Sequence, residues 1–182
     1  MWGIVLLIFG GLRIIVPIFI FAYPIIVTIT STILDICDGY IAYRAKLRWQ
    51  QYHLYDKILD LWWYFWIFLF FANKPLFPVI AVLFIIRLVG QVVSLVKSDT
   101  KYLVWFPNII EHFFLIYLLT YAFGDLSQWF SGRWVIIPLG LSLVIAEFHE
   151  YCLHARNIGL ADILRTKCTK IYWERNEGKT EK

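Results

Sequence analysis

Charged residues are scarce in this 182-residue sequence, and so are cysteine and histidine. Asp, Glu, Lys and Arg make up 16% of the chain, whereas hydrophobic residues make up 60% and the mean hydropathy is +0.67. Soluble domains contain about 45–50% apolar residues, so the composition excludes an ordinary soluble domain. It predicts an all-α integral membrane protein, because a helix satisfies its backbone hydrogen bonds within the segment that lies in lipid.

The three cysteines, Cys37, Cys152 and Cys168, do not form an even set. The distribution of Lys and Arg along the chain puts these cysteines on or near the cytoplasmic side of the membrane, so we expect free thiols. The first apolar stretch also lacks a basic leading region and a small-residue cleavage site, and we expect no cleavable signal peptide. The chain shows no internal repeat and no low-complexity tract.

Six apolar runs of roughly 20 residues are each long enough to cross a hydrocarbon core of about 30 Å as a helix. They cover residues 2–23, 25–43, 56–72, 76–96, 102–123 and 134–153. We therefore predict one domain of six transmembrane helices over residues 1–155. Residues 156–182 form a basic cytoplasmic tail, which either lies on the anionic inner leaflet or is a solvated end.

Lys and Arg are distributed unevenly between the two ends of these predicted helices. Thirteen of the 17 fall on the side of the loop that follows the second helix, whereas Lys74 and Arg133 fall on the opposite side. Basic residues concentrate on the cytoplasmic side of membrane proteins. Both termini and the loop after the second helix are therefore expected in the cytoplasm.

Four aspartates stand close to the loop between the second and third predicted helices. Asp35 and Asp38 are three residues apart, and Asp56 and Asp60 are four apart, so each pair shares one face of a helix. An acidic side chain at membrane depth costs a few kcal/mol, so four of them indicate a functional site. Carboxylate oxygens suit Mg²⁺, Mn²⁺ or Ca²⁺.

The alternative interpretation of these aspartates is structural. In that case the carboxylates pair with nearby cations, namely Lys57, Arg13 or Arg44. Ion pairing with these cations would not require that Asp35 and Asp38, and also Asp56 and Asp60, each share a helix face. The presence of both spacings favours the interpretation as a metal site.

The aspartates belong to a longer pattern, D35-I-C-D-G-Y-I-A followed by D56-K-I-L-D. This pattern resembles the signature of the CDP-alcohol phosphatidyltransferases, D-x2-D-G-x2-A-R-x8-G-x3-D-x3-D. Six of its eight defined positions match, namely the four Asp, Gly39 and Ala42. Tyr43 stands at the family's Arg, with Arg44 one step later, and Tyr52 stands at the family's second Gly.

The resemblance extends weakly to the rest of the chain. Arg13 and Pro17 are similar to the Arg and Pro often found in the family's first helix. Beyond Asp60 the resemblance is limited to the number and length of the helices.

The resemblance implies a phosphatidyltransferase of phospholipid synthesis. An acceptor hydroxyl attacks the β-phosphoryl group of a CDP-linked lipid or alcohol, and CMP leaves. Asp35, Asp38 and Asp56 would hold divalent metal, two Mg²⁺ or Mn²⁺ ions, at the cytoplasmic ends of the second and third helices. Asp60 would hold the second ion and act as the general base. The implied partners are the donor, the acceptor alcohol and the lipid bilayer, with a homodimer common in the family and no nucleic acid.

Several further residues are candidates for donor binding. Gly39 and Ala42 form a small-residue face that, by resemblance, admits the nucleotide; plain helix packing is the alternative. Arg44 is expected to reach a phosphate. Tyr52 either fills the pocket or stacks on the base. Arg13 pairs with Asp35 or reaches a phosphate, or else serves structure alone.

The fifth and sixth predicted helices carry a second polar group. Asn108, Glu111 and His112 share one face, and Glu147, Glu150 and His154 share another. They form either an interhelical polar network or an acceptor site. The candidate acceptor-binding residues are Glu111, His112, Glu147 and Glu150.

Arg87, alone in the middle of the fourth helix, is expected to pair with Glu111 or Glu147. Two other functions remain open. One is a family member that binds metal or lipid without turnover, which Tyr43 and Tyr52 motivate. The other is a different metal-dependent membrane enzyme that uses the Glu and His residues of the last two helices.

Overall fold

The computed structural model describes residues 1–97, 99–124 and 127–152, and within these ranges the chain is helical and has no strand. The α-helices are α1 (Trp2–Ile15), α2 (Pro24–Arg44), α3 (Trp49–Phe71), α4 (Phe77–Lys97), α5 (Ile109–Phe123) and α6 (Ile136–Glu150). Four 3₁₀ helices connect or extend them, namely η1 (Val16–Phe21), η2 (Thr100–Trp105), η3 (Ser127–Phe130) and η4 (Gly132–Val135).

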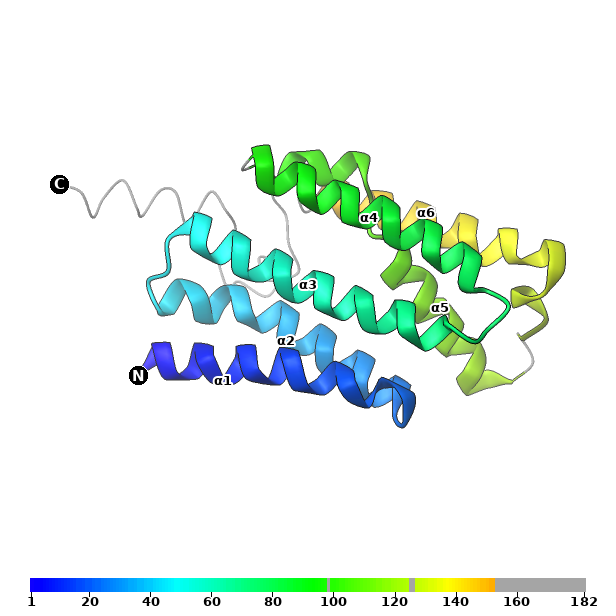
Figure 1. The fold of residues 1–182 in the computed structure, drawn as a ribbon, viewed down its shortest axis with the longest axis horizontal. Coiled ribbons are helices and arrows are strands. Elements are labelled where there is room, and N and C mark those ends of the chain that lie inside the picture. The colour runs from blue at the N-terminus through cyan, green and yellow to red at the C-terminus, as the bar shows by residue number, and fades with distance from the viewer. Residues whose placement is uncertain (98, 125–126, 153–182) are drawn as a thin grey trace.

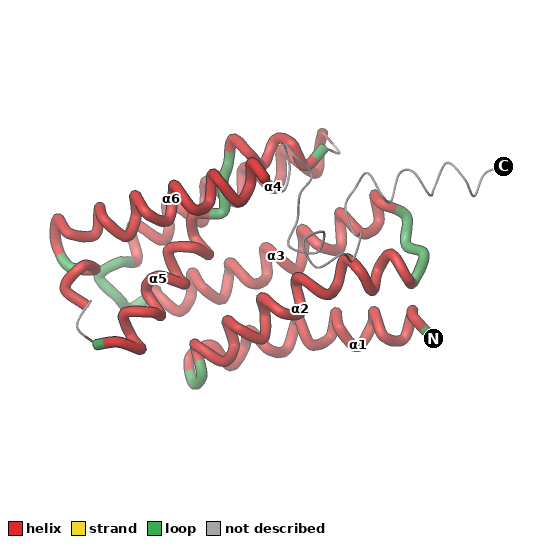
Figure 2. Tube along the Cα trace, turned by 180° about the vertical axis from the view of Figure 1, so that it is seen from behind, coloured by secondary structure: helices red, strands yellow, loops and turns green. Residues whose placement is uncertain are grey.

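Consecutive helices run in alternating directions (Figure 1). The start of α1, the connection between α2 and α3 and the end of α4 therefore lie at one end of the molecule, as the view from behind also shows (Figure 2). Helix α1 packs against α2 and α3, α3 packs against α4 and α5, and α5 packs against α6. This order brings the polar residues of α1, α2 and α3 into one group.

Prolines mark two of the local boundaries near the N-terminus. Pro17 lies in the first turn of η1, where its missing N–H and fixed φ end the regular α-helix. Pro24 occupies the first turn of α2, where a helix needs no backbone donor from that residue. The hairpin between the first two helices therefore turns at Tyr23, as predicted.

The predicted start of the third helix is wrong. Helix α3 begins at Trp49, seven residues before Asp56, and the Gln51 side chain accepts a hydrogen bond from the Arg48 N–H at 3.3 Å. Hydropathy misses these first turns because they contain Gln and His. As a consequence, Asp56 lies about 10 Å along the helix axis from the start of α3, and not at its first residue.

The fifth predicted helix is interrupted. Residues 100–105 form the 3₁₀ helix η2, and α5 starts only at Ile109, after Pro107. Pro107 disfavours a helical conformation in the residue before it. Two contacts hold the bend against α4. The Phe106 side chain packs so closely on Gly90 that a Cβ at Gly90 would collide with it, and the Phe106 carbonyl accepts a hydrogen bond from Arg87 at 2.9 Å.

Within the described residues, four helical segments are long and apolar enough to cross a membrane, namely Trp2–Phe21, Pro24–Arg44, Phe77–Lys97 and Gly132–Glu150. Helix α3 is long enough but carries Asp56, Lys57 and Asp60, and α5 has only 15 residues. Large apolar side chains are exposed on the outer helices, including Leu7, Val144 and Phe148. Such a surface suits contact with lipid. The described chain is thus consistent with an all-α membrane protein.

Aromatic side chains fill the centre of the bundle. Phe71, Phe113 and Phe114 are completely buried between α3, α4 and α5. At the end of α3, the Lys74 ammonium lies 3.2 Å from the ring centroid of Phe70 and donates to the Tyr117 hydroxyl at 3.4 Å. Partial burial lowers the pKa of Lys74 from 10.5 to about 8.

Cys37 and Cys152 are free thiols, which confirms the prediction for these two. Cys168, His154 and the predicted tail 156–182 lie outside the described residues.

Candidate active site

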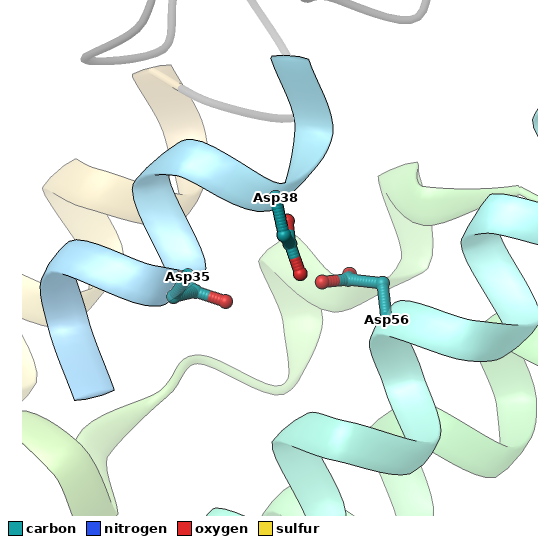
Figure 3. Close-up of side chains that lie close together, drawn as sticks. All are labelled: Asp35, Asp38 and Asp56. Carbon is teal, nitrogen blue, oxygen red and sulfur yellow. The ribbon is translucent and has the colours of Figure 1, made fainter. Parts of the chain in front are cut away.

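Three of the four motif aspartates are drawn in Figure 3, where they point toward one another between α2 and α3. Asp35 and Asp38 come from α2 and Asp56 from α3, and each offers one oxygen within 4.8 Å of the other two. The Asp38 side chain is completely buried, that of Asp56 is 15% exposed and that of Asp35 is 50% exposed. The cluster therefore has a closed inner wall at Asp38 and an open side at Asp35.

The guanidinium of Arg13 lies at the centre of this cluster. Its Nη2 donates to Asp35 at 2.7 Å and to Asp60 at 3.0 Å, and its Nη1 donates to Asp38 and, at 3.4 Å, to Asp56. Pairing with Asp35 was one of the alternatives expected for Arg13, and it is present; the other three carboxylates share the same cation. A planar guanidinium can bind several carboxylates because its donors form a fixed fork.

Lys57 supplies a second cation from within α3. Its Nζ lies 2.7 Å from Asp56 Oδ2 and 2.9 Å from Asp60 Oδ2, and the residue is only 6% exposed. Arg13 and Lys57 bring two positive charges against four negative ones. With all four carboxylates ionised, the cluster keeps a formal excess of two negative charges, and the like-charge repulsion is relieved when another cation binds or a carboxylate takes up a proton.

The donor set fits a divalent metal ion. Mg²⁺ prefers octahedral carboxylate oxygens at about 2.0–2.1 Å, so neighbouring ligands of one ion lie roughly 3 Å apart. The oxygens of Asp35, Asp38 and Asp56 lie within 4.8 Å of one another, so they must draw closer together to share one ion. Arg13 lies among the same oxygens, so an ion must share them with the guanidinium or displace it.

Tyr52 closes one side of the cluster. Its hydroxyl donates to Asp38 Oδ1 at 2.9 Å and lies 3.1 Å from the position that a Cβ would take at Gly39. Its ring is 5.9 Å from that of Trp49. Gly39 therefore gives room to the Tyr52 side chain, and the ring fills space next to Asp38.

The other predicted donor residues lie in different surroundings. Ala42 is completely buried and packs with Leu6 and Ile41 in a small apolar cluster beside Tyr52. The guanidinium of Arg44 lies over two aromatic rings, 4.9 Å from the centroid of Trp2 and 5.8 Å from that of Tyr40. This position places Arg44 on aromatic rings instead of on the aspartates.

Arg87 pairs with Glu150 rather than with Glu111 or Glu147, so that prediction is wrong. Its Nη1 lies 2.8 Å from Glu150 Oε1, and both side chains are buried. The rotation of α6 decides the partner, because Glu150 faces the bundle whereas Glu147 is exposed. Glu147 and Glu150 therefore do not share one face of α6 toward a common site, contrary to the prediction.

Asn108, at the start of α5, connects the remaining polar residues. Its Nδ2 donates to Tyr64 at 2.9 Å and to Glu111, and its carbonyl lies 2.7 Å from His112 Nδ1. The ring of His112 contacts that of His149 at 5.5 Å. These contacts form the interhelical polar network that was one of the two interpretations of this group.

Sequence reasoning missed two buried residues, Gln91 and Tyr64. The Gln91 Nε2 donates to Asp60 Oδ2 at 3.4 Å and so joins the aspartate cluster to the second polar group. A signal was present: Asp60 and Tyr64 are four apart on α3, and Arg87 and Gln91 are four apart on α4. Because α3 and α4 are neighbouring antiparallel helices, the polar face of one contacts the polar face of the other.

No protein-family model, no curated protein and no solved structure matches the chain.

Proposed function

We propose that the chain is a multi-pass membrane enzyme of the CDP-alcohol phosphatidyltransferase type. It transfers a phosphatidyl or phosphoalcohol group from a CDP-linked donor to an acceptor hydroxyl and releases CMP. The observation that carries this proposal is the convergence of three motif aspartates, from two helices, whose carboxylate oxygens lie within 4.8 Å of one another. Scattered surface carboxylates would not converge in this way.

Asp35, Asp38 and Asp56 would hold Mg²⁺ or Mn²⁺, as their oxygen geometry allows. A divalent ion bound there neutralises charge on the phosphates of the donor. The 50% exposure of the Asp35 side chain leaves the open side from which the diphosphate enters.

The chain's own cations orient the reacting groups. The Arg13 fork can turn from carboxylate to phosphate oxygens, which have a similar bidentate geometry. Lys57 bonds to Asp56 and Asp60 and keeps both carboxylates in place. Asp60 takes the proton of the acceptor hydroxyl, a role that contributes about 10²–10⁴-fold in rate when a carboxylate is well placed.

The proposal includes six membrane crossings with both termini in the cytoplasm. Helix α3 crosses despite its charges because Lys57 and Asp60 are buried against partners inside the bundle. Helix α5 is short, and the preceding η2 completes its span. The distribution of Lys and Arg supports the orientation.

A second candidate is a member of the same family that has lost turnover. Tyr52 and Arg13 favour it, because both contact the Asp38 carboxylate that the metal and donor would need. The alternative of a Glu- and His-based metalloenzyme has less support: among described residues, the grouping with metal-ligand geometry is the aspartate cluster.

CMP release separates the two candidates. Purified protein is incubated with CDP-diacylglycerol, Mn²⁺ and a panel of alcohols, and CMP is quantified. The transferase releases CMP in a way that Asp56→Asn abolishes. Asp99→Asn is the matched control, because Asp99 caps η2 and Asn caps equally well. Absence of CMP in the wild type supports the member without turnover.

A further inference from the structure

Three buried polar atoms close to Asp60 have no hydrogen-bond partner in the described structure. They are Gln91 Oε1, Asn108 Oδ1 and Arg87 Nε. Their side chains belong to residues that are 0%, 5% and 4% exposed. A buried polar atom without a partner costs about 1–3 kcal/mol, and native structures contain few of them. Such atoms also occur elsewhere in the described residues, at Ser31 and Trp66 for example, but these three belong to neighbouring side chains, so that one polar ligand would satisfy all of them.

The orientation of the two amides follows from their neighbours. Gln91 turns its nitrogen to the carboxylate of Asp60, and Asn108 turns its nitrogen to that of Glu111. An ionised carboxylate only accepts hydrogen bonds, so the amide nitrogens must face these groups. The atoms left over are therefore the two oxygens, which are acceptors.

These side chains converge on the face of α3 that carries Asp60 and Tyr64. Gln91 bonds to Asp60, and the Arg87 guanidinium lies 5.7 Å from the ring centroid of Tyr64. Asn108 bonds to the Tyr64 hydroxyl from the start of α5. The unsatisfied atoms thus belong to the immediate neighbours of the proposed general base and its adjacent tyrosine.

The charges of this region select the kind of ligand. Arg87 is paired with Glu150 at 2.8 Å, and Glu111 adds a further carboxylate beside Asn108. A phosphate group would meet a cation that is already paired and a nearby carboxylate. Hydroxyl groups suit the region better, because each can donate to an amide oxygen and accept from an N–H.

We infer that Arg87, Gln91 and Asn108 bind the acceptor, and that the acceptor is a small alcohol without a phosphate group. Its hydroxyls donate to Gln91 Oε1 and Asn108 Oδ1 and accept from Arg87 Nε, which leaves one hydroxyl for Asp60. The assignment as acceptor rests on the proposed function, but the preference for an unphosphorylated alcohol rests on these side chains alone.

The test measures binding of matched alcohols to the full chain by saturation-transfer NMR, without donor or metal and in buffer free of glycerol. The pairs are glycerol with glycerol 3-phosphate, and myo-inositol with a myo-inositol phosphate. The unphosphorylated member of at least one pair binds about tenfold more tightly than its phosphorylated counterpart. Asn108→Leu weakens that binding about tenfold, whereas Asn73→Leu, at an exposed position after α3, leaves it unchanged.

The comparison within each pair uses the wild type, so it holds even where Asn108→Leu does not fold. Tighter binding of the phosphorylated members overturns the inference. So does the absence of binding by all four compounds, because water then satisfies the three atoms. Equal binding by folded Asn108→Leu and wild type overturns it as well. Failure of CMP release with intact alcohol binding contradicts the transferase proposal and leaves the alcohol site standing.

Discussion

Tyr52 donates a hydrogen bond to Asp38 across the interface of α3 and α2, with 2.9 Å between the two oxygens. Tyr52 stands where the family signature has Gly, and Asp38 is one of the matching aspartates. The bond is accommodated because Gly39 has no side chain to collide with the phenol. A departure from the signature thus contacts one of the positions that match it and fills space beside the carboxylates.

Replacing Tyr52 with Gly is expected to increase the affinity for CDP-diacylglycerol by about tenfold, or ~1.4 kcal/mol. The reason is that the ring occupies space next to Asp38. Titration of the fluorescent donor into purified variants measures the change. Tyr52→Phe is the control, because it keeps the ring and removes only the bond to Asp38, so its donor affinity stays near that of the wild type. A loss of ~1–3 kcal/mol in Tyr52→Gly would show that the ring stacks on the base instead.

Arg13→Gln is expected to bind Mn²⁺ about tenfold more tightly than the wild type. The guanidinium contacts the same carboxylate oxygens that an ion requires, and the variant removes this competitor. Free Mn²⁺ measured by electron paramagnetic resonance gives the affinity. Arg44→Gln is the matched control, because Arg44 lies over the Trp2 ring. Weaker binding in Arg13→Gln would show that Arg13 organises the metal site and does not compete with the ion.

Asp60→Asn is expected to lower kcat by about 10²–10⁴-fold, while the donor KM stays within a small factor. The amide keeps the shape of the side chain but cannot accept the proton of the acceptor. Its neighbour Gln91 remains within hydrogen-bonding reach of that position. Initial rates of CMP release at varied donor concentrations separate the two constants. Unchanged turnover would remove the role of base, and loss of Mn²⁺ binding would make Asp60 mainly a metal ligand.

Glu150→Leu is expected to destabilise the protein by about 3–5 kcal/mol, because it leaves Arg87 buried without its counter-charge. Glu147→Leu, at an exposed position one turn earlier on α6, should change stability by only about 0.5 kcal/mol. Unfolding followed in detergent gives both values. Equal effects of the two substitutions would mean that the Arg87–Glu150 pair contributes no specific stability.

The apolar runs predicted most of the helices, and helical periodicity predicted the aspartate pairs. The spacing of Asp35 with Asp38, and of Asp56 with Asp60, correctly placed each pair on one face, because such faces follow from 3.6 residues per turn. The start of α3 at Trp49 was missed because hydropathy does not detect a polar first turn. The late start of α5 was missed although Pro107 is a local signal for it.

The contacts between helices could not be predicted in the same way. Which acid pairs with Arg87 depends on the rotation of α6, since Glu147 and Glu150 are separated by less than one turn. The reach of Arg13 to four carboxylates depends on how closely α1 approaches α2 and α3. Packing angles are set by the whole bundle, and no local pattern encodes them.

Donor binding at the aspartate cluster is proposed to require a divalent ion. Binding of CDP-diacylglycerol to purified protein, with and without Mn²⁺, measures this requirement. Mn²⁺ is expected to raise the donor affinity of the wild type and of Asp99→Asn by about tenfold or more, and Asp38→Asn is expected to lose this enhancement. A wild-type affinity that is independent of Mn²⁺, or an enhancement that persists in Asp38→Asn, would show that the aspartates do not bind the donor through an ion.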